Sequence, residues 1–290
     1  MSHLVLRTLN RLAVTFARRG DLSTIDVLIN EGADNIDSIA STAARYGHRN
    51  IVDSMIERGV RDYDVLAFRA AMGGQDAIVS DMITRGARRY DMIAWGAAYG
   101  GHHHLVYNMM ARGPIDPNQI AEGAAFSGLK ELVDQMIGRG AHPYCLIAAG
   151  AAYGGHREIL EDMLRRGAPL GVAPKALLRS VIPEAAKGRH DDIIDLILEA
   201  GITDYTIIAC YAAEGGKRDL VNRMIERGVD NFDRIACYAA RGGHLAIIEE
   251  MIERGAGNFD EIARYASLWD RFKVVKAMIA RGAKDPYIHE

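Results

Sequence analysis

The sequence has almost no excess of charge of either sign. It carries 35 lysines and arginines against 38 aspartates and glutamates, which leaves a net charge of −3 at neutral pH. So small a charge gives no long-range attraction to the phosphate backbone of a nucleic acid or to an anionic membrane. Arginine outnumbers lysine 28 to 7, however, so nucleic-acid binding is kept as an alternative function that a clustered basic stripe would have to support.

Long apolar runs and paired cysteines are also missing. No stretch approaches the roughly 18 apolar residues that a membrane span needs, and residues 1–20 carry charges where a signal peptide would have an apolar core. Cys145, Cys210 and Cys237 are too few and too scattered for a disulfide framework. We therefore expect a cytoplasmic protein with no membrane association.

The sequence contains no motif that indicates catalysis. A glycine-rich phosphate loop, a His-Glu-x-x-His helix, a Cys-x-x-Cys pair and a nucleophile elbow are all missing. The triplet at 102–104 is all histidine, but no cysteine or carboxylate set completes a metal site around it. Histidine also recurs at one turn position, as His48, His156, His190 and His244. There we expect it to brace the turn, so we predict neither an enzyme nor a metal or cofactor.

What the sequence does have is a repeat. Each unit closes on a glycine, at Gly32, Gly59, Gly86, Gly113, Gly140, Gly167, Gly201, Gly228, Gly255 and Gly282. These glycines recur with a constant period of 27, except for one longer step between Gly167 and Gly201. Repeat arrays grow by stacking similar units without one central core. We predict ten units in a single domain over residues 1–290, with an irregular loop at 168–178 that separates six units from four.

Each unit predicts two antiparallel helices. The apolar residues of 39–44 and of 51–56 recur at i, i+1, i+4 and i+5, which places them on one stripe of a helix. A glycine between the two runs, such as Gly47, can adopt the left-handed conformation that ends a helix. Because such short helices are marginal in isolation, packing against neighbouring units must stabilise them. The repeated alanine pairs predict a close approach between the first helices.

Polar residues at fixed positions predict how the helices begin and end. A short polar side chain next to the start of each first helix predicts an N-cap, at Asp37, Asp64, Asp91, Asn118, Asp233 and Asp260. An arginine near the end of the second helix is well placed against the helix dipole, at Arg58, Arg85, Arg112, Arg139, Arg166, Arg227, Arg254 and Arg281. We therefore interpret these arginines as structural residues.

The segments 43–48 (Ala-Ala-Arg-Tyr-Gly-His) and 239–244 (Ala-Ala-Arg-Gly-Gly-His), each followed by an apolar pair and a Met-Ile-Glu-Arg-Gly ending, resemble the two-helix core of ankyrin repeats. Ankyrin units run to about 33 residues with a Thr-Pro-Leu-His signature; the units of this chain are shorter by six and lack it. The resemblance implies an all-α, ankyrin-like solenoid of ten helical hairpins with reduced β-fingers. The short units also resemble the arrays of large DNA viruses of protists, which implies a host-interaction factor in the host cytoplasm.

One position of the first helix is the candidate binding position. In ankyrin repeats the residues after the alanine pair usually face the concave groove, and the resemblance maps the groove onto Arg45, Met72, Tyr99, Phe126, Tyr153, Lys187, Glu214, Arg241 and Leu268, each with its successor. Trp269 is added because it takes the place of a turn glycine. The candidate partner-binding residues are Tyr99, Phe126, Tyr153, Arg45, Glu214, Arg241 and Trp269.

Two interpretations of the groove aromatics stay open. Tyr99, Phe126 and Tyr153 each follow a glycine one helical turn earlier, at 96, 123 and 150. In the first interpretation each ring fills the gap left by its own glycine. In the second the rings form a strip that contacts a partner, since aromatic residues are enriched at interface hot spots.

Later units place tyrosine where these glycines stand. We expect Tyr211, Tyr238 and Tyr265 to pack in the core. Cys210 and Cys237 lie one unit apart, too far for a disulfide between stacked helices, and we expect both to be core thiols. The favoured function is a monomeric scaffold that binds a protein partner. A self-assembling structural or particle-associated protein is the alternative from a different class.

Overall fold

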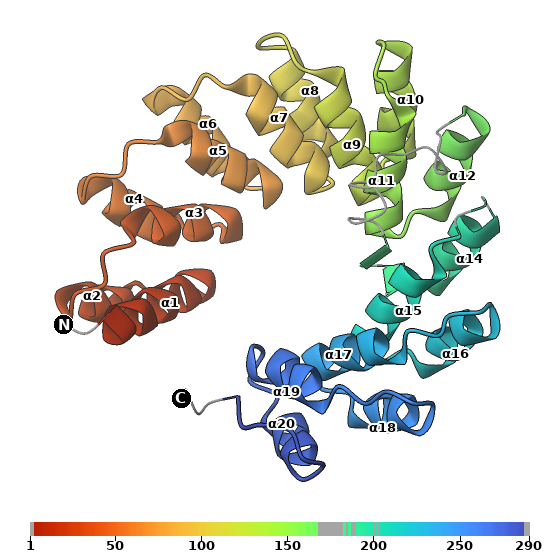
Figure 1. Cartoon of the computed structure of the whole chain (residues 1–290). Coiled ribbons are helices and arrows are strands. Elements are labelled where there is room, and N and C mark those ends of the chain that lie inside the picture. The colour runs from red at the N-terminus through yellow and green to blue at the C-terminus, as the bar shows by residue number, and fades with distance from the viewer. Residues whose placement is uncertain are drawn as a thin grey trace. The chain divides into compact units, whose positions relative to one another are not determined.

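We describe the protein from a computed structural model, which describes residues 3–167, 182–183, 185–186, 190–199, 201 and 203–286. Every regular element in this part of the chain is helical, and the helices pack mainly on their neighbours along the sequence (Figure 1). The predicted all-α class is therefore confirmed. The predicted irregular loop at 168–178 lies outside the described residues.

The first of two compact units, Met1–Pro143, consists of consecutive helical hairpins. Its helices are α1 (His3–Arg19), α2 (Leu22–Asn30), α3 (Ile36–Tyr46), α4 (Arg49–Glu57), α5 (Tyr63–Met72), α6 (Asp76–Arg85), α7 (Tyr90–Tyr99), α8 (His103–Met110), α9 (Pro117–Ser127) and α10 (Lys130–Gly138). Each odd-numbered helix packs on the even-numbered helix that follows it, and α1, α3, α5 and α7 also pack on the next odd-numbered helix. The odd-numbered helices thus form the seam between hairpins.

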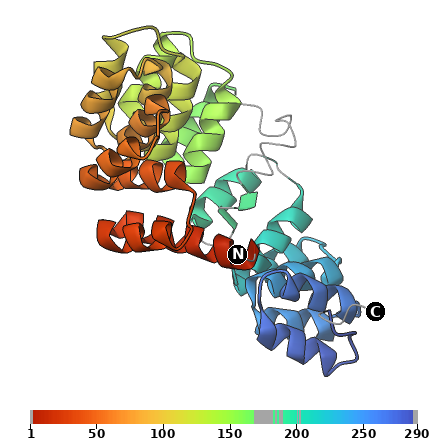
Figure 2. The same cartoon turned by 90° about the vertical axis from the view of Figure 1, so that its left-hand side faces the viewer.

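The second compact unit, Tyr144–Glu290, repeats this pattern. Its helices are α11 (Tyr144–Gly154), α12 (Arg157–Arg165), α14 (Asp191–Glu199), α15 (Tyr205–Glu214), α16 (Arg218–Glu226), α17 (Phe232–Gly242), α18 (Leu245–Glu253), α19 (Phe259–Ser267) and α20 (Phe272–Ile279). Hairpins α15–α16, α17–α18 and α19–α20 lie next to one another in chain order (Figure 2). The prediction that residues 1–290 form a single domain stays a prediction.

Small residues form the seam. The paired alanines of α3, α5, α7, α9, α15 and α17 are completely buried. A glycine just after α5 is equally necessary: a Cβ at Gly73 would lie 1.8 Å from the backbone oxygen of Arg45 in the preceding hairpin. A side chain there would force the two hairpins apart. The predicted close approach of the first helices is confirmed.

The turn glycines adopt the conformation that the sequence predicts. Gly47, Gly128 and Gly243 have φ values of 82°, 80° and 85°, which l-residues with a side chain rarely adopt. In the last hairpin it is Asp270, with φ 56°, that takes the place of this glycine. The prediction that Trp269 replaces a turn glycine is therefore wrong by one residue, because Trp269 stands where other hairpins have the glycine just before the turn.

The predicted N-caps are wrong by two residues. Asp64 and Asp233 lie inside the first turns of α5 and α17, because these helices begin one residue earlier, at Tyr63 and Phe232. The residue before the aromatic caps the helix instead. The side chains of Asp62, Asn231 and Asn258 accept hydrogen bonds from the backbone N–H groups of Val65, Arg234 and Glu261 at 3.0 to 3.2 Å.

Four of the misassigned residues have another role, which is to hold the loop of the next hairpin. Asp64 Oδ1 accepts hydrogen bonds from the backbone N–H groups of Arg88 and Arg89, at 2.7 and 2.8 Å. The same step of 24 residues joins Asn10 to Asp34, Asn118 to His142, Asp233 to Gly257 and Asp260 to Lys284. We call these bonds the loop clips. They provide acceptors for backbone N–H groups in the loops, which have no partner within a helix or strand.

The helix-end arginines also join successive hairpins. Their partners lie 32 residues earlier, on the second helix of the preceding hairpin: Arg58 with Asp26, Arg85 with Asp53, Arg254 with Asn222 and Arg281 with Glu249, at 2.6 to 3.6 Å. The structural interpretation of these four arginines is confirmed. Each exposed pair contributes at most about 1 kcal/mol. These arginine contacts therefore align the hairpins more than they stabilise them.

The turn histidines brace the preceding hairpin, as predicted for His48 and His244. His48 Nε2 lies 3.0 Å from the backbone oxygen of Arg18, and His244 Nε2 lies 3.1 Å from that of Glu214. Arg271 occupies this place in the last hairpin, where its Nε donates to the backbone oxygen of Arg241 at 3.1 Å.

The loop clips predict a stability difference between two otherwise equivalent aspartates. Asp64→Ala removes a carboxylate that accepts two backbone hydrogen bonds, so we expect the first unit to lose about 1 to 2 kcal/mol of unfolding free energy. Asp37→Ala is the matched control, since Asp37 lies at the same position of α3 and makes none of the described clips. Urea denaturation measures both variants. Equal losses would contradict the role given to the clips.

Candidate functional site

The groove position of the first unit carries a stacked aromatic pair. Tyr99, at the end of α7, and Phe126, near the end of α9, have ring centroids 3.9 Å apart and ring planes only 9° from parallel. Both residues are half-buried. Tyr153 on α11, at the same position in the second unit, has 40% of its surface exposed. The first two predicted rings are therefore brought together.

The glycines near these rings face the preceding hairpin. A Cβ at Gly96 would lie 2.7 Å from both the ring and the backbone oxygen of Phe68, which belongs to the preceding hairpin. At Gly123 a Cβ would lie 3.0 Å from the backbone nitrogen of Tyr99. The preceding hairpin therefore supplies the atoms nearest to both glycines, and the two interpretations of the rings both stay open. These glycines permit close contact between hairpins.

Sequence reasoning missed a second aromatic pair on the first helices. Phe68 on α5 and Trp95 on α7 have ring centroids 5.4 Å apart at an angle of 32°. They lie one repeat period apart, so they occupy the same position in successive units. That shared position was the signal that could have identified the pair, because residues one period apart lie on adjacent hairpins.

Glu214, Arg241 and Trp269 come together in the second unit. Arg241 Nε on α17 lies 3.4 Å from Glu214 Oε1 on α15, and the guanidinium carbon lies 4.5 Å from the ring centroid of Trp269. The side chain of Glu214 is 12% exposed and that of Arg241 is 30% exposed. Trp269 is 49% exposed. A carboxylate and an indole ring thus fix one guanidinium group, while part of the ring faces solvent.

The tyrosines of the later units pack against one another. Tyr211 and Tyr238 make an edge-to-face contact with centroids 5.3 Å apart, and Tyr265 lies 6.4 Å from Tyr238. Burial raises the pKa of the Tyr238 hydroxyl above its usual value. All three side chains are partly buried, as the core-packing interpretation predicts.

Cys210 and Cys237 are core thiols, as predicted. They are 1% and 5% exposed, and burial raises the pKa of each thiol to about 12. Because the thiolate is the reactive form, such a thiol is nearly inert near neutral pH. These residues therefore contribute packing rather than chemistry.

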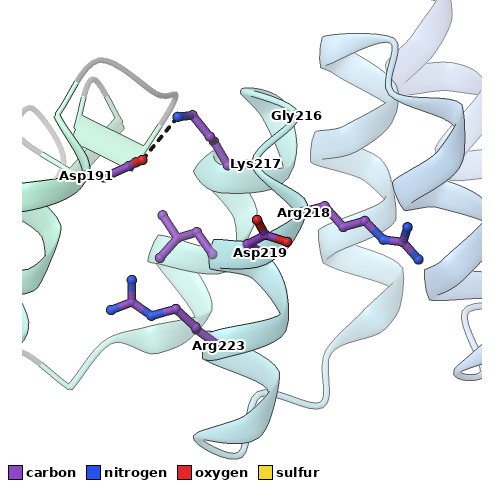
Figure 3. A pocket seen from close by; sticks show the side chains of 7 residues that line it. Asp191, Gly216, Lys217, Arg218, Asp219 and Arg223 are labelled. Carbon is purple, nitrogen blue, oxygen red and sulfur yellow. Dashed lines mark hydrogen bonds and ion pairs between the residues drawn. The ribbon is translucent and has the colours of Figure 1, made fainter.

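A cavity in the second unit is lined by charged side chains that form ion pairs within the protein (Figure 3). It lies where α15 turns into α16 and has a volume of about 330 Å³. Lys217 Nζ lies 3.3 Å from Asp191 Oδ2, and Arg223 forms an ion pair with Asp195. The cations at this cavity are neutralised by carboxylates of the protein itself, so the cavity offers little charge to a ligand.

Glu250 on α18 neutralises two further cations. Its carboxylate lies 2.6 Å from Arg218 Nε, and it accepts from Arg254 at 3.1 Å. Burial alone would raise the pKa of this carboxyl, but the two guanidinium groups outweigh burial and lower it. The pairing is therefore complete at neutral pH.

Arg45 occupies a different environment, a cavity among α1, α3 and α5 that also contains Arg18 and Arg69. It is exposed. The structure thus places the seven candidate residues in different surroundings: one stacked pair, one charged cluster, one basic cavity, and Tyr153 exposed on α11.

No protein-family model matches the chain, and no curated protein matches its sequence. Within the described residues, no three histidine, cysteine or acidic side chains are grouped as a metal ion would require. His104 of the histidine triplet contacts the carboxylate of Asp76, with Nε2 3.0 Å from both oxygens. None of the described helices has the length and apolar character to cross a membrane.

The buried thiols give a direct test of the packing. In a Cys145→Ser variant at pH 8, we expect Cys210 and Cys237 to resist a thiol-specific chromogenic reagent, because a pKa of about 12 leaves roughly one thiolate in ten thousand. Both should react at once in denaturant. The absorbance of the released dye measures the number of reactive thiols. Fast stoichiometric reaction of the folded variant would show that the two residues are not in the core.

Proposed function

We propose that this chain is an ankyrin-like repeat protein of ten hairpins that binds a protein partner through the face of its first helices. In the ankyrin arrangement this face is the concave one. The proposal describes a non-enzymatic scaffold in the cytoplasm, which would be that of a host cell if the protein is viral. The hairpins that pack through their first helices, and the turns that His48 and His244 brace, support the ankyrin resemblance.

One observation carries the binding proposal: the groove position holds organised but incompletely buried side chains. Its neighbours on the first helices, the paired alanines, are completely buried. Many arginines of the second helices are neutralised by acidic side chains. The stacked rings of Tyr99 and Phe126 and the cluster around Arg241 are already fixed in place.

Such fixed groups favour binding for an energetic reason. Ordering a flexible side chain at an interface costs about 0.5 to 1.5 kcal/mol, and a ring that is already stacked avoids most of that cost. Aromatic residues and arginine are also the residue types that contribute most at interface hot spots. The groove position therefore combines suitable chemistry with preorganisation.

The test compares a variant that lacks the stacked pair with a variant that lacks an exposed tyrosine elsewhere on the same unit. In affinity capture from a lysate of a candidate host, we expect Tyr99→Ser/Phe126→Ser to retain at least tenfold less of a specific partner than the unmodified protein. Tyr107→Ser is the control, because Tyr107 is 44% exposed on α8, a second helix. It should retain the partner fully.

Thermal unfolding and light scattering of the same samples separate binding from folding. Loss of the ring stack should cost about 0.5 to 1.5 kcal/mol beyond the apolar area that the two substitutions remove, and all three proteins should be monomers. Equal capture by all three would refute the proposal. A large loss of stability in the groove variant, with partner retention restored at lower temperature, would assign the rings to packing.

A further inference from the structure

A basic cavity lies among the first three odd-numbered helices of the first unit. It has a volume of about 260 Å³. Its lining includes Arg18 on α1, Ser41, Thr42, Arg45 and Tyr46 on α3, and Arg69 on α5. None of the residues that line it is acidic. Three successive hairpins therefore each contribute one arginine to the same small cavity.

These arginines differ from those of the second helices in having no acidic partner. In the part of the chain that the structure describes, Arg58 and Arg85 bind carboxylates of the preceding hairpin, whereas no ion pair includes Arg18, Arg45 or Arg69. The guanidinium carbon of Arg18 lies 5.6 Å from the ring centroid of Tyr46. A ring positions a cation without neutralising its charge.

Three uncompensated guanidinium groups with hydroxyl groups beside them match a phosphate ester. A phosphorylated side chain carries about −1.5 to −2 charges at pH 7 and three strong acceptor oxygens. Guanidinium groups bind such oxygens in pairs of parallel hydrogen bonds, and arginine clusters are a recurring way to recognise phosphorylated segments. The cavity is smaller than the pockets of drug-sized ligands, which begin at roughly 300 Å³, so it suits one phosphorylated side chain.

The position of the cavity links it to the groove. Arg45 occupies the repeat position that holds Tyr99 and Phe126 further along the same unit. Adjacent hairpins lie about 8 to 10 Å apart, so Arg45 and Tyr99, two hairpins apart, are separated by about 16 to 20 Å. An extended peptide covers that distance with about five or six residues. One partner segment can therefore contact both sites.

We propose that this cavity binds a phosphoserine or phosphothreonine of the partner, whose neighbouring apolar residue contacts Tyr99 and Phe126. This inference rests on the proposed function. A membrane surface is disfavoured as the source of phosphate, because electrostatic membrane binding uses clusters of four to eight basic residues near the surface. Here three arginines converge on one cavity in a chain whose net charge is −3.

The experiment uses two pools of fluorescent peptides that are random except for one central residue, phosphoserine in one pool and serine in the other. Retention on the immobilised full-length protein is measured at physiological salt. We expect at least tenfold more of the phosphoserine pool to be retained. The retained peptides should be enriched in an apolar residue five or six positions from the phosphoserine, and millimolar inorganic phosphate should displace them.

Matched double variants locate the binding site. Arg45→Gln/Arg69→Gln should reduce the preference for phosphoserine to near one, whereas Arg58→Gln/Arg85→Gln, which removes the same charge from ion-paired arginines of the same unit, should keep it. Circular dichroism verifies that both variants fold. Equal retention of the two pools, or equal loss in both variants, would refute the proposal.

Two further outcomes also decide the question. Binding to phosphatidylserine vesicles that abolishes peptide retention would assign the cavity to lipid headgroups and overturn the proposal. If phosphoserine preference fails while partner capture still depends on Tyr99 and Phe126, only this inference is wrong. If the preference holds while capture is independent of those rings, the proposed groove is wrong and the phosphate site stands.

Discussion

The close approach of the first helices is the constraint on which the rest of the structure depends. Alanine pairs recur in all but the first and last repeats, and those of α3, α5, α7, α9, α15 and α17 are completely buried, so these first helices can lie against the next with almost no side chain between them. Short helices cannot persist alone. Each hairpin is therefore stabilised by packing against its neighbours, as the units of other repeat proteins are.

That approach determines what the other positions can do. Once the first helices lie close together, residues 24, 30 and 32 apart fall within hydrogen-bonding distance, and these are the steps of the loop clips, the turn braces and the arginine bridges. These interactions tie successive hairpins through polar groups at the surface. The groove position lies beside the seam, and there the chain can vary its side chains without disturbing the packing.

Much of this could be predicted from the sequence, because the repeat period assigns every residue a defined position within its unit. The helix pairs, the left-handed glycines, the buried alanines and the core thiols all follow from residue type at a repeated position. The caps were wrong because Asp64 and its equivalents look like N-cap residues, yet the preceding aromatic already belongs to the helix. Only the loop of the next hairpin reveals what the carboxylate binds.

The candidate site was predictable in part. The stacking of Tyr99 on Phe126 followed from their common position, but the partner of Gly96 did not, since Phe68 lies on another hairpin. The basic cavity was predictable only in part, because Arg18 and Arg45 lie one repeat period apart at the same position, whereas Arg69 occupies a different position and joins them only through stacking. Periodicity identifies ladders of equivalent residues, whereas a site built from unlike positions requires the geometry.

The most direct test of the alanine seam compares one substitution at two places in the first unit. Ala97 on α7 is completely buried and Ala111, just after α8, is exposed, so Ala97→Leu and Ala111→Leu add the same atoms with and without a neighbour to displace. We predict from denaturant unfolding that Ala97→Leu lowers the unfolding free energy by about 2 kcal/mol or more, while Ala111→Leu changes it by less than about 0.5 kcal/mol. Equal effects of the two substitutions would contradict the account.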